Sequence, residues 1–354
     1  MTFDADMYDA AIIGLGPAGA AAARLLGDKL RVVAIDRKTK DGGFSKPCGG
    51  LLAPDAQRAL SKFNLTLPKD VLVDPQIFAV KTLDTAQGLL RYYPRFYINL
   101  DRRKFDDWLI SLIPERVELV VGAVCRDVRR VAGGFEISFN AEGAERVVTA
   151  KRVIGADGSD SVVRRSLFPE RKIRRYTAIQ QWFEEKHATP FYSCVFDREI
   201  TDSYCWSVSK DGYFIFGGAF PSSGARERFE RMKKKLSERG YSFGEPVKTE
   251  ACLVSSPRGA GDFCLGASGA FLVGEAAGFI SPSSLEGISY ALDSACLLAG
   301  VIGAGGDENG RYRRAARAVV TKLLLKYVKS WFMYGVLSRA LIMRSGLRSI
   351  DVKE

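Results

Sequence analysis

Residues 8–36, YDAAIIGLGPAGAAAARLLGDKLRVVAID, hold an apolar run, a glycine-rich turn, an alanine-rich stretch and a second apolar run that closes on Asp36. The two short apolar runs predict strands, and the alanine-rich stretch between them predicts a helix. A strand, a crossover helix and a second strand form a βαβ unit, whose strands are parallel. This stretch therefore predicts the start of a parallel sheet with helices on its faces.

The turn between the first strand and the helix reads G-L-G-P-A-G, with glycines at positions 14, 16 and 19. In this spacing the first glycine permits a tight turn, the second lets the backbone approach a pyrophosphate, and the third lets the helix pack closely on the strand. The helix N-terminus then faces the phosphate charge, and Asp36 accepts a hydrogen bond from a ribose hydroxyl. Because all these parts follow in the required order, the stretch predicts a dinucleotide site.

Two later turns have a similar form, an apolar strand that ends beside glycine and an acid. KRVIGADG, residues 151–158, closes on Asp157 and Gly158, and AFLVGEAAGFISP, residues 270–282, contains Gly274 and Glu275. Between them, at about residues 170–255, short aromatic strands predict an antiparallel sheet. We therefore expect a nucleotide-binding domain that is assembled from segments far apart in the sequence.

Composition argues against several other classes of protein. The chain has 354 residues, of which 47% are hydrophobic, which is enough for two domains. Its seven cysteines are scattered without a C-x-x-C spacing, so neither a disulfide framework nor a metal site is expected. The single histidine, His187, has no nucleophile-elbow motif beside it, which argues against a Ser-His-Asp hydrolase. No basic segment precedes the first apolar run, so we expect a first strand, not a signal peptide, and a cytoplasmic protein.

The net charge of +11 is concentrated near the C-terminus, since residues 311–350 hold ten Lys or Arg and no Asp or Glu. Lys322, Lys326 and Lys329 alternate there with aliphatic and aromatic residues, a pattern that predicts an amphipathic helix. No uncharged run approaches the roughly 18 residues that a membrane-spanning helix needs. Two interpretations stay open: the helix lies peripherally on an anionic membrane surface, on the inner face of the membrane, or it packs as a cap on the rest of the protein. Nucleic-acid binding is not expected, because no nucleic-acid motif accompanies the charge.

Together the three turns resemble the signature of FAD-binding flavoproteins of the p-hydroxybenzoate hydroxylase fold. Two further motifs, KPCGG at residues 46–50 and YCWSVSKDG at residues 204–212, are similar to the geranylgeranyl reductase branch of that fold, in which a CGG loop and a Y-x-W-x-x-x-K strand recur. The stretches SKPCGGLLAPDAQ, AIQQWF and DGYFIFGGA resemble the CbrA-like flavoproteins of this branch in particular.

This resemblance extends from residue 8 to about residue 300 and implies an α/β (α+β) fold. A Rossmann-like FAD-binding domain would carry an inserted antiparallel-sheet substrate domain and a C-terminal helical region. We expect the FAD-binding domain at residues 1–75, 99–168 and 257–302, the substrate domain at 76–98 and 169–256, and basic amphipathic helices at 303–354.

The same resemblance implies FAD as the cofactor and assigns its contacts. The family usually has aspartate where this chain has Glu275, whose longer side chain can still accept from a ribityl hydroxyl. The helix that starts near Glu286 would direct its N-terminal dipole toward the flavin ring. The expected cofactor-binding residues are Gly14, Gly16, Pro17, Ala18, Gly19, Asp36, Arg37, Cys48, Gly49, Gly50, Arg102, Val124, Asp157, Gly158, Gly274, Glu275, Gly278, Gly287 and Ile288.

On the substrate side, period-two spacing places Tyr204 and Trp206 on one face of a strand. Aromatic residues in this pattern belong either to a sheet core or to a ligand wall, and the resemblance implies a wall of a long apolar cavity beside the flavin. We expect Tyr204, Trp206 and Phe216 to contact the substrate, and Cys48 and Tyr204 to be catalytic.

The resemblance implies an enzyme that reduces C=C bonds of an isoprenoid (prenyl or polyprenyl) lipid with hydride from reduced FAD. Its electron donor stays unidentified, and Cys48, Tyr204 or a water molecule remains open as the proton donor. A flavin monooxygenase of an apolar or aromatic substrate is one alternative. A membrane-associated redox flavoprotein without small-molecule turnover is another, because fold alone does not separate these activities.

Overall fold

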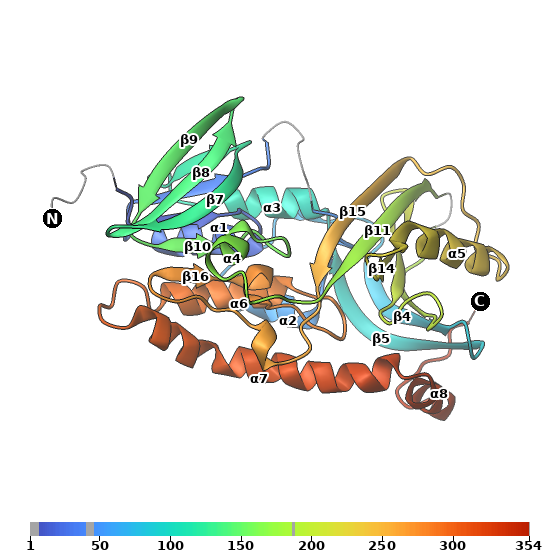
Figure 1. The fold of residues 1–354 in the computed structure, drawn as a ribbon. Helices are drawn as coiled ribbons and strands as arrows, with labels where there is room; N and C mark the ends of the chain where they lie inside the picture. The colour runs from blue at the N-terminus through green and yellow to red at the C-terminus, as the bar shows by residue number, and fades with distance from the viewer. Residues whose placement is uncertain (1–6, 40–45, 186–187, 354) are drawn as a thin grey trace.

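The computed structural model describes residues 7–39, 46–185 and 188–353, so His187 lies outside the described residues. Figure 1 shows a body with two parts, a parallel sheet with its helices at one end and a large curved sheet at the other, and a long helix beneath both. The expected α/β fold, with an antiparallel sheet and C-terminal helices, is confirmed.

The first sheet has five parallel strands in the order β16-β10-β1-β2-β6. Its strands come from distant parts of the chain: β1 (Ala10–Ile13), β2 (Val32–Asp36), β6 (Glu118–Val121), β10 (Val153–Gly155) and β16 (Ala270–Leu272). The strand residues of β1 and β2 are buried on both faces, as expected for a parallel sheet between two layers. The three strand-ending turns of the sequence therefore meet at one edge of this sheet.

Helices and a small sheet cover the two faces of the parallel sheet. One face packs against α1 (Pro17–Leu26), α3 (Arg102–Ser111) and α6 (Ile288–Ala299), with α2 (Pro54–Lys62) beside α6. The other face packs against an antiparallel sheet of β7 (Val124–Val131), β8 (Gly134–Ala141) and β9 (Ala144–Ala150). The short helix α4 (Val162–Leu167) follows β10 and contacts β7.

The large sheet has eight strands in the order β15-β11-β14-β13-β12-β4-β5-β3. All its neighbours are antiparallel except β12 and β4, which are parallel. Helix α5 (Ala225–Ser237) packs on one face through Phe229, Met232 and Leu236. The strands are β3 (Leu51–Leu52), β4 (Ile77–Asp84), β5 (Leu89–Asn99), β11 (Arg175–Glu184), β12 (Phe191–Phe196), β13 (Cys205–Lys210), β14 (Tyr213–Phe220) and β15 (Lys248–Ser255).

Two helices end the chain, α7 (Glu308–Tyr334) and α8 (Val336–Ser345), and α7 runs along both parts of the body (Figure 1). Its inner face is part of the core, since Tyr312, Ala316 and Leu323 are fully buried. The Tyr312 hydroxyl donates to the Leu272 carbonyl oxygen at 3.0 Å, which ties α7 to the parallel sheet. Among the described residues, no helix combines the length and the apolar character that crossing a membrane requires.

Candidate functional site

The turn after β1 and the turn after β10 are in direct contact. Gly14 has φ +95°, and a Cβ atom there would lie 2.7 Å from the Ala156 carbonyl oxygen. A Cβ atom at Gly19 would lie 1.7 Å from the Gly14 carbonyl oxygen, so helix and turn approach as closely as backbone allows. At Gly16, by contrast, a Cβ atom would meet no atom within 4 Å. The space at Gly16 therefore lies directly before the first turn of α1, where Pro17 and Ala18 begin the helix.

Asp36 ends β2 beside this turn and is buried. Its carboxylate accepts the Leu15 backbone N–H and, at 2.6 Å, the Lys38 backbone N–H. These bonds fix the carboxylate at the carboxyl edge of the sheet, where a ribose hydroxyl is expected. The neighbouring Arg37 is exposed.

A buried charge network lies beside Asp36. Asp106 accepts from Lys38 Nζ at 2.7 Å and from Arg102 Nε at 2.8 Å. Burial would lower the pKa of Arg102, but the Asp106 carboxylate and the Cys48 side chain beside it keep that pKa raised. The sequence predicts Arg102 at the cofactor, and the structure adds that Asp106 binds both Arg102 and Lys38 and that Cys48 lies next to Arg102.

The turn after β10 presents Asp157 and Gly158. Asp157 Oδ2 accepts the Val162 and Val163 backbone N–H groups at 2.6 and 3.2 Å. Its other oxygen is buried and has no hydrogen-bond partner among the described residues. Burial raises the pKa of Asp157 above its ordinary value. Val124, the remaining predicted residue on this side, begins β7 and is partly exposed.

The turn after β16 holds Gly274, with φ +56°, and Glu275. Both oxygens of Glu275 have protein partners: Oε1 accepts the Ser255 backbone N–H at 2.8 Å, and Oε2 forms an ion pair with Lys46 Nζ. The longer arm of glutamate thus reaches β15 and the loop that carries Cys48. Sequence reasoning assigned Glu275 to the cofactor and missed Lys46, although Lys46 belongs to the quoted KPCGG motif.

The segment after this turn leads to α6, whose first residue is Ile288 and whose N-cap residue is Gly287. Glu286 precedes it and caps the first turn, because its carboxylate accepts both the backbone N–H and the hydroxyl of Ser289 at 2.9 Å. Burial raises the pKa of Glu286. Gly278, with φ +90°, ends the short helix η3 (Gly274–Ala277) and lies beside the Asp262 carbonyl oxygen.

The Cys48 loop packs on β13. Lys210 Nζ is buried and donates to the Leu100 carbonyl oxygen at 2.6 Å and to the Gly50 carbonyl oxygen at 3.4 Å. Burial lowers the pKa of Lys210 to about 8, although Cys48 and nearby carboxylates oppose this shift. The Gly50 backbone N–H donates to Cys48 Sγ at 3.4 Å, and a Cβ atom at Gly49 would meet no atom within 4 Å. Sequence reasoning quoted Lys210 in its motif but assigned it no role.

The predicted substrate residues divide between the two faces of the large sheet. Tyr204 and Trp206 share one buried cluster, with ring centroids 5.8 Å apart, and Tyr204 donates to the Ser284 carbonyl oxygen at 2.7 Å. Phe216 pairs with Ser207 in the β13–β14 register and stacks on Phe229 of α5. The structure therefore does not bring Phe216 together with Tyr204 and Trp206, because it lies on the opposite face in the core beneath α5.

The fold and the three turns define the chain as a protein with the fold of the FAD-dependent oxidoreductases. A geranylgeranyl bacteriochlorophyll reductase-like protein from Thermoplasma acidophilum has a TM-score of 0.77 at 18% identity, over 94% of this chain and 88% of that chain. PqsL of Pseudomonas aeruginosa, a "probable FAD-dependent monooxygenase", has a TM-score of 0.71 at 17% identity, over 96% and 99%. Protein CbrA of Escherichia coli O6:H1 is 54% identical over 346 residues, 97% of this chain and 94% of its own. The chain belongs to the CbrA family, and no family model matches it.

Proposed function

We propose that this protein is an FAD-dependent oxidoreductase that reduces C=C bonds of an isoprenoid lipid. One observation carries the proposal: the two sequence motifs that resemble the reductases are in contact. Lys210, at the end of the strand that begins after Tyr204, donates to the Gly50 carbonyl oxygen of the loop that carries Cys48 at 3.4 Å. The reductase-like protein from Thermoplasma acidophilum has the same fold, which is compatible with this activity.

The residues at the carboxyl edge of the parallel sheet fit FAD. The open space at Gly16 stands before the N-terminus of α1, whose first amides have no acceptor within the helix. Asp157 Oδ1 is a buried atom without a partner among the described residues, so a polar group of the cofactor would satisfy it. Asp36 would hold the adenosine ribose, and Glu275 the ribityl chain.

Bound FAD would supply the hydride for reduction of the double bond. The chain's own residues would provide a dry, aromatic environment for an alkene and its cation-like state. Tyr192, Tyr204 and Trp206 form such a surface, in which the Tyr192 hydroxyl lies 3.2 Å from the Tyr204 hydroxyl. Burial raises the pKa of Tyr204 well above its ordinary value, so its phenol stays protonated and can donate a hydrogen bond.

An anaerobic single-turnover experiment tests this proposal. The purified flavoprotein is photoreduced, a polyprenyl lipid is added, and flavin absorbance and the mass of the lipid are followed together. Reoxidation of the flavin with a gain of two hydrogens in the lipid is the expected result. A flavin that stays reduced until air is admitted, with a lipid that then gains oxygen or nothing, would favour the monooxygenase or the electron-transfer alternative.

We also propose that the outer face of α7 and α8 docks on an anionic membrane surface. Exposed apolar side chains follow one stripe of α7 and continue along α8, with Leu325 66%, Trp331 59%, Phe332 56%, Leu337 80% and Leu341 69% exposed. Arg313, Arg314 and Arg317 are exposed at helical spacing on the stripe that leads to these residues. An apolar stripe beside basic residues is the pattern of helices that lie in a membrane interface.

Point substitutions test the surface better than removal of residues 311–354, because that removal would expose the core around Tyr312 and Leu323. Trp331→Ser with Phe332→Ser should reduce sedimentation with phosphatidylglycerol vesicles and leave the melting temperature unchanged. Phosphatidylcholine vesicles provide the neutral control. Equal sedimentation of the variant and the native protein with both vesicles would refute the docking surface.

A further inference from the structure

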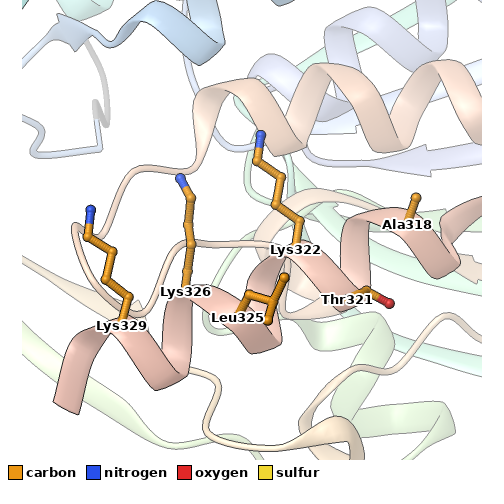
Figure 2. Close-up of a pocket in the computed structure, with 6 residues that line it drawn as sticks. All are labelled: Ala318, Thr321, Lys322, Leu325, Lys326 and Lys329. Carbon is orange, nitrogen blue, oxygen red and sulfur yellow. The ribbon is translucent and has the colours of Figure 1, made fainter. Parts of the chain in front are cut away.

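A groove of about 530 Å³ lies along α7 and is lined by three lysines together with Ala318, Thr321 and Leu325. Figure 2 shows Lys322, Lys326 and Lys329 extending from α7 to the same side of the helix. Lys322 and Lys326 reach Asp55 of α2 at 3.1 and 3.4 Å. No hydrogen bond or ion pair joins Lys329 to the described part of the chain. Asp55 also pairs with Arg58, so three cations already share this carboxylate and Lys329 has no share in it.

The other charged groups around the groove do not restore neutrality. Burial and the positive charges of Arg95 and Lys326 lower the pKa of Lys329, which means that its charge is poorly compensated. Glu286 is near Lys326, but its two carboxylate oxygens already accept the backbone N–H and the hydroxyl of Ser289. The groove thus has an excess of positive charge that a dianion would compensate.

A buried tyrosine adds a hydrogen-bond donor. The Lys322 and Lys326 Nζ atoms lie 5.5 and 5.4 Å from the ring centroid of Tyr290. Tyr290 is 1% exposed, and its hydroxyl has no hydrogen-bond partner among the described residues. Burial and nearby carboxylates raise the pKa of Tyr290, so the phenol is protonated. A buried donor without an acceptor is costly, and an anionic oxygen would satisfy it.

A series of contacts between side chains runs from Arg95, whose positive charge acts on Lys329, to the proposed substrate surface. Arg95 lies 5.9 Å from the ring centroid of Tyr97, and the centroids of Tyr97 and Tyr192 are 5.8 Å apart. The Tyr192 hydroxyl meets that of Tyr204 at 3.2 Å, and Tyr204 contacts Trp206. These contacts connect the surroundings of Lys329 with the proposed substrate surface.

We propose that the groove lined by Lys322, Lys326 and Lys329 binds the phosphate or diphosphate head of the prenyl substrate. The inference deepens the proposed function, on which it rests, because it assigns the head group of that lipid. Lys329 supplies the free cation, Lys322 and Lys326 share their charge between Asp55 and the phosphate, and Tyr290 donates to a phosphate oxygen. The same phosphate chemistry exists in bilayer lipids, so the experiment separates the two sources.

Binding to the full-length protein with oxidised flavin tests the inference without turnover. Farnesyl phosphate and farnesol share one chain and differ only in the phosphate. The native protein should bind farnesyl phosphate at least about tenfold more tightly than farnesol, because each charge-assisted hydrogen bond contributes at least that factor. Lys329→Gln should lower this ratio by about tenfold, since one charge-assisted hydrogen bond is lost, and it removes no hydrogen bond or ion pair within the described part of the chain.

Arg317→Gln is the matched control, since it removes one positive charge from the exposed side of the same helix. It should keep the preference for farnesyl phosphate and weaken binding to phosphatidylglycerol vesicles, whereas Lys329→Gln should bind vesicles as the native protein does. Equal affinity for phosphate and alcohol in the native protein would overturn the inference. If Lys329→Gln loses vesicle binding but keeps the preference for farnesyl phosphate, the inference is refuted as well, and Lys329 binds the head group of a bilayer lipid instead. A lipid that binds with this Lys329-dependent preference but is never reduced would refute the proposed reductase and leave the groove assignment standing.

Discussion

Substitution of Gly16 by valine tests the cofactor site while leaving the fold intact, because the structure has room for a side chain at this position. The residue has φ −69° and ψ −175°, which valine adopts readily, and a Cβ atom would meet no atom within 4 Å. Valine at the N-cap position of α1 should lower the free energy of unfolding by up to about 1 kcal/mol. The apoprotein should therefore fold, with a melting temperature about 1–2 °C lower.

The effect on FAD should be much larger, since the valine methyl groups would occupy the space that the pyrophosphate needs. At a free FAD concentration of about 100 times the dissociation constant, FAD stabilises the native protein by about 2.7 kcal/mol. In a chain of this size that corresponds to an increase in melting temperature of about 4 °C. Gly16→Val should lose this FAD-induced increase and purify without the yellow colour.

The assay is a thermal melt of deflavinated protein with and without FAD, together with the flavin absorbance of the purified variants. Gly259→Val is a matched control, because Gly259 is also an extended N-cap glycine with no atom within 4 Å of its Cβ position. It should keep the full FAD-induced increase. Gly19→Val, whose Cβ would collide with the Gly14 carbonyl oxygen, should fail to fold at all. A yellow, FAD-stabilised Gly16→Val protein would refute the assigned pyrophosphate site.

Three further predictions follow from buried groups. The pKa of Lys210, about 8 in the folded protein, lies below that of an ordinary lysine at 10.5, so the unfolded chain binds more protons between these values and stability rises with pH. Relative to Lys210→Met, the native protein should therefore gain about 3 kcal/mol between pH 8 and pH 10.5, measured by urea unfolding; equal pH profiles would refute a buried, titrating Lys210. Arg339→Met should leave Asp84 buried without the ion pair at 2.8 Å and lower the free energy of unfolding by about 3 kcal/mol, while Arg339→Met with Asp84→Leu should recover most of it. If the double variant melts as low as the single one, the ion pair is not the cause. Trp206→Ala should weaken prenyl-lipid binding and keep the FAD-induced increase in melting temperature. Unchanged lipid affinity would show that Trp206 has a purely structural role.

The sequence predicted the local parts of the fold well, because they depend on short-range patterns. The βαβ unit from Ala10 to Asp36 and the helix that Pro54 begins are formed where the pattern places them. The order of strands in the large sheet was beyond reach, since β4 pairs in parallel with β12, and the pairing joins Val80 to Tyr192 across a long stretch of chain. Alternation of apolar residues identifies strands but carries no information about which strands become neighbours.

The C-terminal helix illustrates the same limit for amphipathic patterns. The pattern correctly predicted a helix with basic and apolar residues at regular spacing, but it could not tell which side faces the protein. In the structure Leu323 is buried, Trp331 and Phe332 are exposed, and Lys322 and Lys326 turn toward Asp55 of α2. The two interpretations of this helix, membrane surface and packed cap, are therefore compatible, because one face packs and another remains exposed.

The site depends most on pairs that only the fold brings together. Glu275 occupies the position where the resembling flavoproteins usually have aspartate, and the structure gives a physical reason for the longer side chain. One carboxylate oxygen accepts from the Ser255 backbone, and the other pairs with Lys46 from the Cys48 loop. An aspartate is shorter by one methylene group and would not reach both partners from the same backbone position. The extra methylene thus links the turn after β16 to the loop with Cys48. The position of that loop therefore depends on which residue stands at position 275.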